Sequence, residues 1–147
     1  MSDKKKILLV EDNRADARLV VEVFRDQNVQ VDVEVVRDGE QAMQYLYECA
    51  ERGKKECPDL ILLDLNMPKK DGREVLAEIK NTPRLRKIPV VILSTSQSDE
   101  DILKSYNLQA SCYVSKPIDL DKFTAIIKSF DEFWFSAVRF PPRECHS

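Results

Sequence analysis

Acidic side chains directly follow two short apolar runs in this 147-residue sequence. The run at residues 60–63 ends in Asp64, and the run at residues 7–10 is followed by Glu11 and Asp12. Short apolar runs bounded by turn residues indicate buried β-strands. A buried carboxylate without a partner is costly, so the position of Asp64 predicts a cation or a basic side chain nearby.

Two further apolar runs end in residues that can take part in chemistry. Ser94 follows the run at 90–93, and Lys116 comes shortly after the run at 112–114. In an open parallel sheet the carboxyl ends of the strands meet at one crevice. We therefore expect that crevice to hold three carboxylates, a hydroxyl and an ammonium. Clustered carboxylates repel one another and favour a cation. Oxygen ligands suit Mg²⁺, and a backbone carbonyl just after Asp64 can complete its coordination.

This set of groups predicts phosphoryl transfer to a carboxylate. Asp64 would be the nucleophile and would form an aspartyl phosphate. Mg²⁺ and Lys116 would neutralise the transferring group, and Ser94 would donate a hydrogen bond to a phosphoryl oxygen. Each residue alone has a plainer interpretation, because Glu11–Asp12 can cap a helix, a serine after a strand is uninformative, and a lysine before proline is usually solvated.

The remaining sequence predicts the elements that place these residues. Apolar runs predict strands at 7–10, 31–36, 60–63, 90–93 and 112–114. Apolar spacing predicts helices at 14–27 (capped by Asn13 or Asp12), at 99–106 and from the cap Asp119 through Trp134. Two further helices are predicted, one after Gly39 with its apolar residues between 42 and 50, and one after Gly72 that ends before Pro83. A charged loop is predicted at 51–55. Strict alternation of strands and helices indicates an α/β protein with a doubly wound, five-stranded parallel sheet, built as (βα)5 in one domain.

The composition argues against several other classes of protein. The net charge of −3 gives no footprint for nucleic acid. No apolar run approaches the roughly 18 residues of a membrane span, and the basic start is not a signal peptide, so we expect a cytoplasmic protein. Cysteines occur at 49, 57, 112 and 145 without a C-x-x-C pair or a histidine cluster, so zinc is not expected. We expect reduced structural thiols, with Cys112 in the core and Cys145 exposed.

The sequence resembles the receiver domains of two-component response regulators, the CheY-like family, over about residues 5–130. The residues that carry the resemblance are Glu11-Asp12, Asp64 with Met67-Pro68 and Gly72, Ser94, and Lys116-Pro117. The resemblance implies a flavodoxin-like receiver fold with strand order 2-1-3-4-5. It also implies a phosphoacceptor signalling protein, not an enzyme, that assists its own phosphorylation and dephosphorylation.

The resemblance further implies a role for each site residue. Asp64 would accept a phosphoryl group from the phosphohistidine of a sensor histidine kinase. Mg²⁺ would be held by Glu11, Asp12, Asp64 and the backbone carbonyl of Asn66, with Asp12 the direct side-chain ligand beside Asp64. Lys116 would pair with the acceptor or its phosphate, Ser94 would be the switch hydroxyl, and Tyr113 would be the switch aromatic.

Three features are similar to the small regulators that are paired with cyanobacterial phytochromes. These are the long segment between Gly39 and Asp64, the hydroxyl run at 94–96 and the extended last helix. The kinase partner implied by this similarity is a phytochrome.

The C-terminal part of the chain predicts a protein contact. We expect a receiver domain at 1–135 and a C-terminal extension at 136–147. Successive helical residues point about 100° apart, so the aromatic residues there cannot all face one core. An exposed apolar patch suggests a partner surface, and we expect a homodimer or partner contact. The alternative is a tail that folds back on its own domain. The residues are Phe133, Trp134, Phe135 and Phe140.

Three other functions compete with this interpretation. A phosphatase of the haloacid dehalogenase type needs a second acid two residues after the nucleophile, where this chain has Asn66. A flavin binder needs a small, glycine-rich loop after the first strand, where this chain has acidic residues. A degenerate receiver would act as a non-phosphorylated scaffold, although Asp12, Asp64 and Lys116 are all present.

Overall fold

The computed structural model describes residues 5–26, 31–53, 57–65, 67, 71–94, 112–116 and 119–135. Five strands form one sheet: β1 (Lys5–Val10), β2 (Val31–Val36), β3 (Leu60–Asp64), β4 (Val90–Ser94) and β5 (Cys112–Ser115). The helices are α1 (Arg14–Asp26), α2 (Gly39–Arg52), α3 (Gly72–Lys80) and α5 (Leu120–Phe135). The predicted helix at 99–106 lies outside the described residues.

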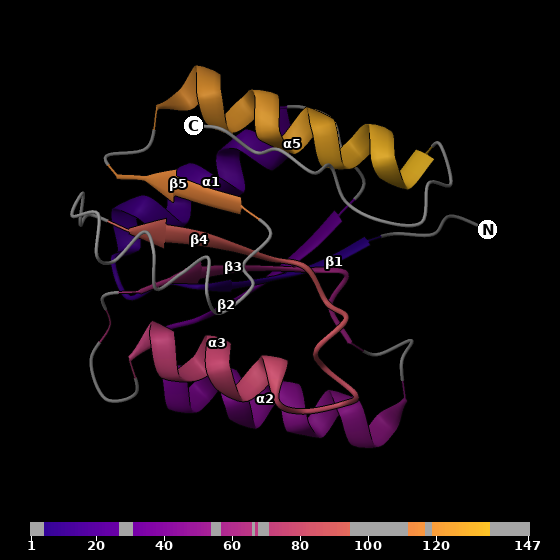
Figure 1. Cartoon of the computed structure of the whole chain (residues 1–147). Coiled ribbons are helices and arrows are strands. Elements are labelled where there is room, and N and C mark those ends of the chain that lie inside the picture. The colour runs from indigo at the N-terminus through magenta and orange to yellow at the C-terminus, as the bar shows by residue number, and fades with distance from the viewer. Residues whose placement is uncertain are drawn as a thin grey trace.

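All neighbouring strands run parallel, in the order β2-β1-β3-β4-β5. This order confirms the predicted receiver fold. The helices cover both faces of the sheet, with α1 and α5 on one side and α2 and α3 on the other (Figure 1). Burial on both faces explains why the strands are almost wholly apolar.

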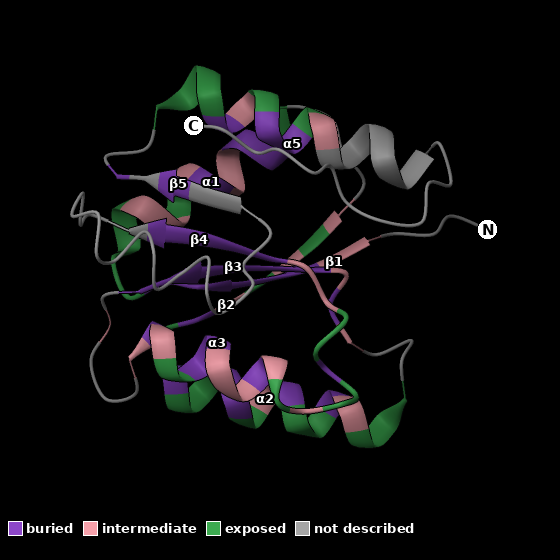
Figure 2. Cartoon of the chain, in the orientation of Figure 1, coloured by how far each residue is buried: buried purple, intermediate pink, exposed green. Residues whose placement is uncertain are grey.

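Alternation along the strands divides the core into two clusters. Leu8, Val10 and Leu63 pack on the face covered by α2 and α3. Ile7, Leu9 and Leu62 pack on the opposite face with residues of α1 and α5. Successive strand residues point to opposite faces, so β1, β3 and β4 each contribute to both clusters. The central strands are therefore buried throughout their apolar positions, as Figure 2 shows.

Aromatic packing joins the two helices on one face. The rings of Phe24 in α1 and Phe123 in α5 meet edge to face, with centroids 6.4 Å apart and an interplanar angle of 81°. Both side chains are buried. Edge-to-face pairs contribute roughly 0.5–1.5 kcal/mol beyond the area they bury, so this contact fixes α5 beside α1.

Side-chain caps determine where the helices begin. The Asn13 side chain accepts from the Asp16 N–H at 2.9 Å, so Asn13 caps α1 and Asp12 does not. Asp38 caps α2 by accepting from the Gln41 N–H. Asp71 caps α3 in a reciprocal capping box with Glu74. Because Asn13 caps α1, helix capping does not explain why an acid stands at position 12.

The predicted charged loop at 51–55 is partly wrong, because α2 continues through Arg52. Gly53 ends the helix with φ of 116°, and its N–H donates to the Cys49 carbonyl at 3.1 Å. Positive φ at a helix end is favourable for glycine, so the helix stops where glycine first permits the turn. No helix within the described ranges is long and apolar enough to cross a membrane.

Candidate phosphoacceptor and metal site

Three carboxylates meet at the carboxyl ends of β1 and β3. Val10 pairs with Leu63 in the parallel ladder, so the residues that follow them, Glu11 and Asp64, lie at the same edge. Oxygen atoms of Glu11, Asp12 and Asp64 all lie within 4.8 Å of one another. Glu11 and Asp64 are buried, whereas Asp12 is exposed. The cluster therefore combines two buried acids with one acid open to solvent.

Lys116, just after β5, supplies a buried positive charge to this cluster. Its Nζ lies 2.6 Å from Oε1 of Glu11 and 3.3 Å from Oδ2 of Asp64. It also lies 3.0 Å from Oδ2 of Asp16 in α1. The residue is only 5% exposed. A buried ammonium needs such partners, because an unpaired buried charge is strongly destabilising.

Both oxygens of Glu11 are engaged within the protein. Oε1 accepts from the Lys116 ammonium, and Oε2 accepts from the Asn13 N–H at 3.2 Å. Burial, with a smaller contribution from the neighbouring Asp64, raises the pKa of Glu11 to about 7, although the Lys116 hydrogen bond acts to lower it. For Lys116, burial acts to lower the pKa, but the hydrogen bonds with Glu11 and Asp16 and the charge of Asp64 raise it above its ordinary value.

The start of α3 packs directly against the backbone of Asp64. The Leu65 N–H donates to the Leu93 carbonyl at 3.0 Å, and the Gly72 N–H donates to the Leu65 carbonyl at 3.1 Å. A Cβ atom at Gly72 would lie 2.4 Å from the Asp64 carbonyl oxygen. Only glycine fits this approach, so Gly72 helps to fix the backbone that carries Asp64.

The acidic cluster has the donors and the spacing that a hard divalent cation needs. Mg²⁺ takes octahedral oxygen ligands at about 2.0–2.1 Å, which places neighbouring ligand oxygens about 3 Å apart and opposite ones about 4 Å apart. The 4.8 Å limit on the three carboxylates is close to this range. All donors are oxygen atoms, as Mg²⁺ and Mn²⁺ prefer. These residues therefore fit a magnesium-type ion.

The structure brings together four of the predicted site residues: Glu11, Asp12, Asp64 and Lys116. Ser94 ends β4, next to the Leu93 position that pairs with Asp64, and Tyr113 pairs with Ile92. The side chains of Ser94 and Tyr113 lie outside the described part of the chain, as does Asn66.

The sequence interpretation missed Asp16. Its carboxylate contacts Lys116, although it comes from a helix and not from a strand end. A signal was available, because Asp16 lies in the first turn of the helix that begins directly after Glu11 and Asp12. The start of that helix faces the same edge of the sheet, so acids in its first turn belong among the site candidates.

The predicted interface residues cannot be placed by contacts. Phe133, Trp134 and Phe135 belong to the backbone of α5, but their side chains lie outside the described part, and Phe140 lies outside it altogether. Residues 136–147 are also outside the described ranges. The side chain of Cys112, which was expected in the core, also lies outside the described part of the chain.

Comparison with known proteins agrees with this geometry. The family model for the response regulator receiver domain matches residues 7–128. The response regulator Rcp1 of Synechocystis sp. is 46% identical over 96% of this chain and 99% of its own length. The crystal structure of a phosphorylated cyanobacterial phytochrome response regulator, RcpA, is 52% identical with a TM-score of 0.78, covering 94% of this chain and 99% of RcpA.

The Mn²⁺-bound crystal structure of Rcp1 is 46% identical to the chain with a TM-score of 0.77, covering 94% of this chain and 99% of Rcp1. The resemblance to regulators of cyanobacterial phytochromes is thereby confirmed. The chain belongs to the response regulator receiver domain family, the signalling domains of two-component systems.

Proposed function

We propose that the chain is a cytoplasmic, phosphorylation-controlled signalling protein that accepts a phosphoryl group on Asp64 in the presence of Mg²⁺. The observation that carries the proposal is the position of Asp64 between two groups of opposite charge. Lys116 lies 3.3 Å from one oxygen of Asp64, and Glu11 and Asp12 complete a three-carboxylate cluster beside it. A nucleophile, a fixed ammonium and a cation site are the parts that phosphoryl transfer to a carboxylate requires.

The donor in this proposal is the phosphohistidine of a sensor histidine kinase. An Asp64 carboxylate oxygen attacks phosphorus, so that a P–O bond forms and the P–N bond to the imidazole breaks. The imidazole nitrogen then takes a proton from solvent. The Lys116 ammonium balances negative charge on the acyl phosphate from within the protein, since it stays protonated in its acidic surroundings. A bound Mg²⁺ supplies charge neutralisation on the phosphoryl oxygens.

Asp12 and Asp64 are the side chains that would hold the metal directly, with the Asn66 carbonyl as a backbone ligand. Asp12 is exposed, so an ion can reach its carboxylate from solvent. Both Glu11 oxygens already accept hydrogen bonds, from Lys116 and from the Asn13 N–H. Glu11 would therefore act by orienting Lys116 and by adding negative charge near the metal.

The output in this proposal is a change of protein contacts. Ser94 would donate to a phosphoryl oxygen, and Tyr113 would turn inward behind it. The strands that carry these residues, β4 and β5, are adjacent, with Ser94 paired to Ser115. A local bond to the phosphoryl group would thus be coupled to the surface beside β5.

The kinase in this proposal is a phytochrome. RcpA, which is 52% identical to the chain over nearly its full length, is a cyanobacterial phytochrome response regulator. The competing function is a scaffold that is never phosphorylated. That function would give no reason for a buried Lys116 to face three acids, since buried charge clusters are costly to maintain.

The test is mass spectrometry of the intact chain after incubation with acetyl phosphate and Mg²⁺. We expect the wild type to gain one phosphoryl group and the Asp64→Asn variant to gain none. Asp26→Asn, an exposed acid at the end of α1, is the matched control and should be modified like the wild type. A wild type that is never modified would favour the scaffold, and modification that persists in Asp64→Asn would place the acceptor elsewhere.

The domain division at residues 135 and 136 and the homodimer are part of the same proposal. Helix α5 extends to Phe135, which supports the prediction of a long last helix leading into the aromatic residues. Sedimentation of Trp134→Ala and Phe135→Ala tests the dimer: both variants should show a lower mass than the wild type. An unchanged mass in both variants would count against this surface, and a monomeric wild type would exclude the dimer.

A further inference from the structure

Two cysteines that are eight residues apart meet away from the acidic site. Cys49 lies near the end of α2, and Cys57 precedes β3. Their sulfur atoms are 2.7 Å apart, closer than two unbonded sulfur atoms ordinarily approach. Cys49 is 3% exposed, whereas Cys57 is partly exposed. Both are free thiols in this structure, and the acidic site does not use either.

The surroundings of Cys49 make it a poor nucleophile on its own. Its thiol donates to the Leu46 carbonyl at 3.1 Å, and burial together with the Cys57 contact raises its pKa to about 12. The positive charges of Lys6 and Arg52 act in the opposite direction. A buried thiol of this kind reacts only with a group already held beside it, and Cys57 is such a group.

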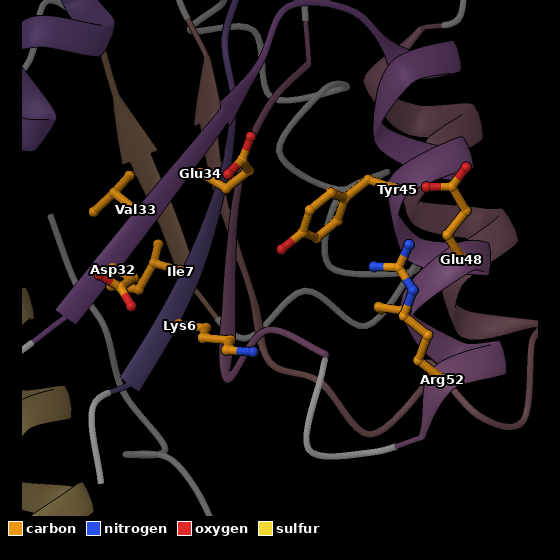
Figure 3. Close-up of a pocket in the computed structure, with 9 residues that line it drawn as sticks. Lys6, Ile7, Asp32, Val33, Glu34, Tyr45, Glu48 and Arg52 are labelled. Carbon is orange, nitrogen blue, oxygen red and sulfur yellow. The ribbon is translucent and has the colours of Figure 1, made fainter. Parts of the chain in front are cut away.

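A cavity of about 370 Å³ adjoins the pair on the side of Cys49. It lies between the beginnings of β1 and β2 and the C-terminal half of α2 (Figure 3). Glu11 and Asp64 lie at the opposite, carboxyl ends of β1 and β3. Lys6 extends into it from β1, and Tyr45 and Arg52 extend into it from α2. Cys49 also lines the cavity.

We propose that Cys49 and Cys57 form a reversible intramolecular disulfide, with a low-molecular-weight disulfide such as oxidised glutathione as the oxidant. The contact between the two sulfur atoms carries the inference. A disulfide S–S bond is about 2.05 Å long, so the two sulfurs need to move by well under 1 Å in total. The spacing of the two residues and the end of α2 at Gly53 already bring them together.

The exchange has two steps, and the exposures of the two residues set their order. Cys57, the more exposed thiol, loses its proton to solvent and attacks one sulfur of oxidised glutathione. A mixed disulfide forms, and one glutathione thiolate leaves. Cys49 then loses its proton and attacks the Cys57 sulfur, which releases the second glutathione thiolate. The protein loses two protons and two electrons in total. The two released glutathione thiolates take up two protons, so one oxidised glutathione becomes two reduced glutathione molecules.

The bond would join the end of α2 to Cys57, which lies shortly before β3. It would close only the short connection that contains Gly53, and it would leave the ladder between β1 and β3 unchanged. The proposal therefore assigns a redox modification site that is separate from the acidic site.

The test treats the full chain with excess oxidised glutathione and measures the intact mass and the tryptic peptides. The wild type should lose two hydrogen atoms, retain no glutathione on Cys57 and yield a peptide pair linked through Cys49 and Cys57. Addition of dithiothreitol should return the original mass. Glutathione retained on Cys57 of the wild type, or no link between the two cysteines, would overturn the proposal.

Three variants separate this pair from the other thiols. Cys49→Ser should retain one glutathione on Cys57, because the resolving thiol is gone. Cys57→Ser should leave Cys49 unmodified, because burial protects it. Cys145→Ser, the matched control, should form the same Cys49–Cys57 link as the wild type. A link from Cys57 to Cys112 or Cys145 in place of Cys49 would also refute the assignment.

Discussion

The Lys116 ammonium lies closer to Glu11 than to the proposed phosphoacceptor. The two distances are 2.6 Å to Oε1 of Glu11 and 3.3 Å to Oδ2 of Asp64. The sequence interpretation paired Lys116 with Asp64 or its phosphate. In this structure the ammonium therefore makes its shorter contact with Glu11 and its longer contact with Asp64.

Replacement of Lys116 by Met should destabilise the fold. The change leaves Glu11 and Asp64 buried without their cation. Breaking a buried ion pair by removing one partner costs about 3–5 kcal/mol, and we expect the lower end, because Glu11 can take up a proton. Urea unfolding measures this. Lys128→Ala, an exposed lysine of α5, is the control. Equal unfolding midpoints for the two variants would contradict the role of Lys116.

Mg²⁺ should stabilise the wild type and not the Asp12→Asn variant. A ligand at 100 times its dissociation constant adds about 2.7 kcal/mol to the free energy of unfolding. Asp12 is exposed, so its replacement should change stability by roughly 0.5 kcal/mol or less without metal. Thermal melts with and without Mg²⁺ measure both effects, with Asp26→Asn as the control. A Mg²⁺ response that survives in Asp12→Asn would remove Asp12 from the metal site.

Gly72→Ala should impair the site as well as the fold. The new Cβ would lie 2.4 Å from the Asp64 carbonyl oxygen, so the backbone of β3 or α3 must shift. Overpacking of this kind costs roughly 1–3 kcal/mol. We also expect slower modification of Asp64 by acetyl phosphate.

Gly53→Ala is the informative control for that variant. Gly53 has φ of 116° but no atom within 4 Å of an added Cβ, so its replacement strains the backbone without a steric contact. Gly53→Ala should therefore lose stability and keep the rate at Asp64. If both variants slow the modification equally, the effect of Gly72→Ala comes from stability alone.

Stability should fall at alkaline pH because of Cys49. Burial, aided by the Cys57 contact, raises the pKa of Cys49 from an ordinary 9.0 to about 12. Between these values the unfolded chain ionises this thiol and the folded chain does not. The stabilising contribution is therefore complete below pH 9 and is lost as the pH rises towards 12.

Urea unfolding of the wild type and Cys49→Ala at pH 8 to 11, with a reducing agent, measures this contribution. Lysines and tyrosines titrate in both proteins, so only the difference between the two curves reports on Cys49. We expect the wild type to lose stability more steeply above pH 9. Parallel curves would show that the thiol ionises with equal ease in the folded and unfolded chain.

The sheet was predictable from the sequence because its strands are buried on both faces. The run at residues 60–63 has no polar position, which is typical of a strand buried on both faces, and an acid follows it directly. Parallel pairing then places Glu11, Asp64 and Lys116 at one edge. The grouping of these residues therefore followed from topology alone.

Contacts made by helical residues were not predictable in the same way. Asp16 reaches Lys116 from the first turn of α1, and the periodicity of the strands does not reveal a contact from a helix. Cys49 and Cys57 meet close to the point where α2 ends at Gly53. The two cysteines form no C-x-x-C pair, so the approach of their sulfur atoms was not predicted from the sequence.

The pairing of β1 with β3 also limits where the chain can gain or lose residues. Ile7 pairs with Leu60, and each later residue keeps that register up to Val10 and Leu63. One residue inserted within β3 would turn each following side chain to the opposite face, because side chains alternate along a strand. It would also move Asp64 about 3.3 Å further along the strand. Changes of length in this protein are therefore tolerable in its connections and not in the strands that carry Glu11 and Asp64.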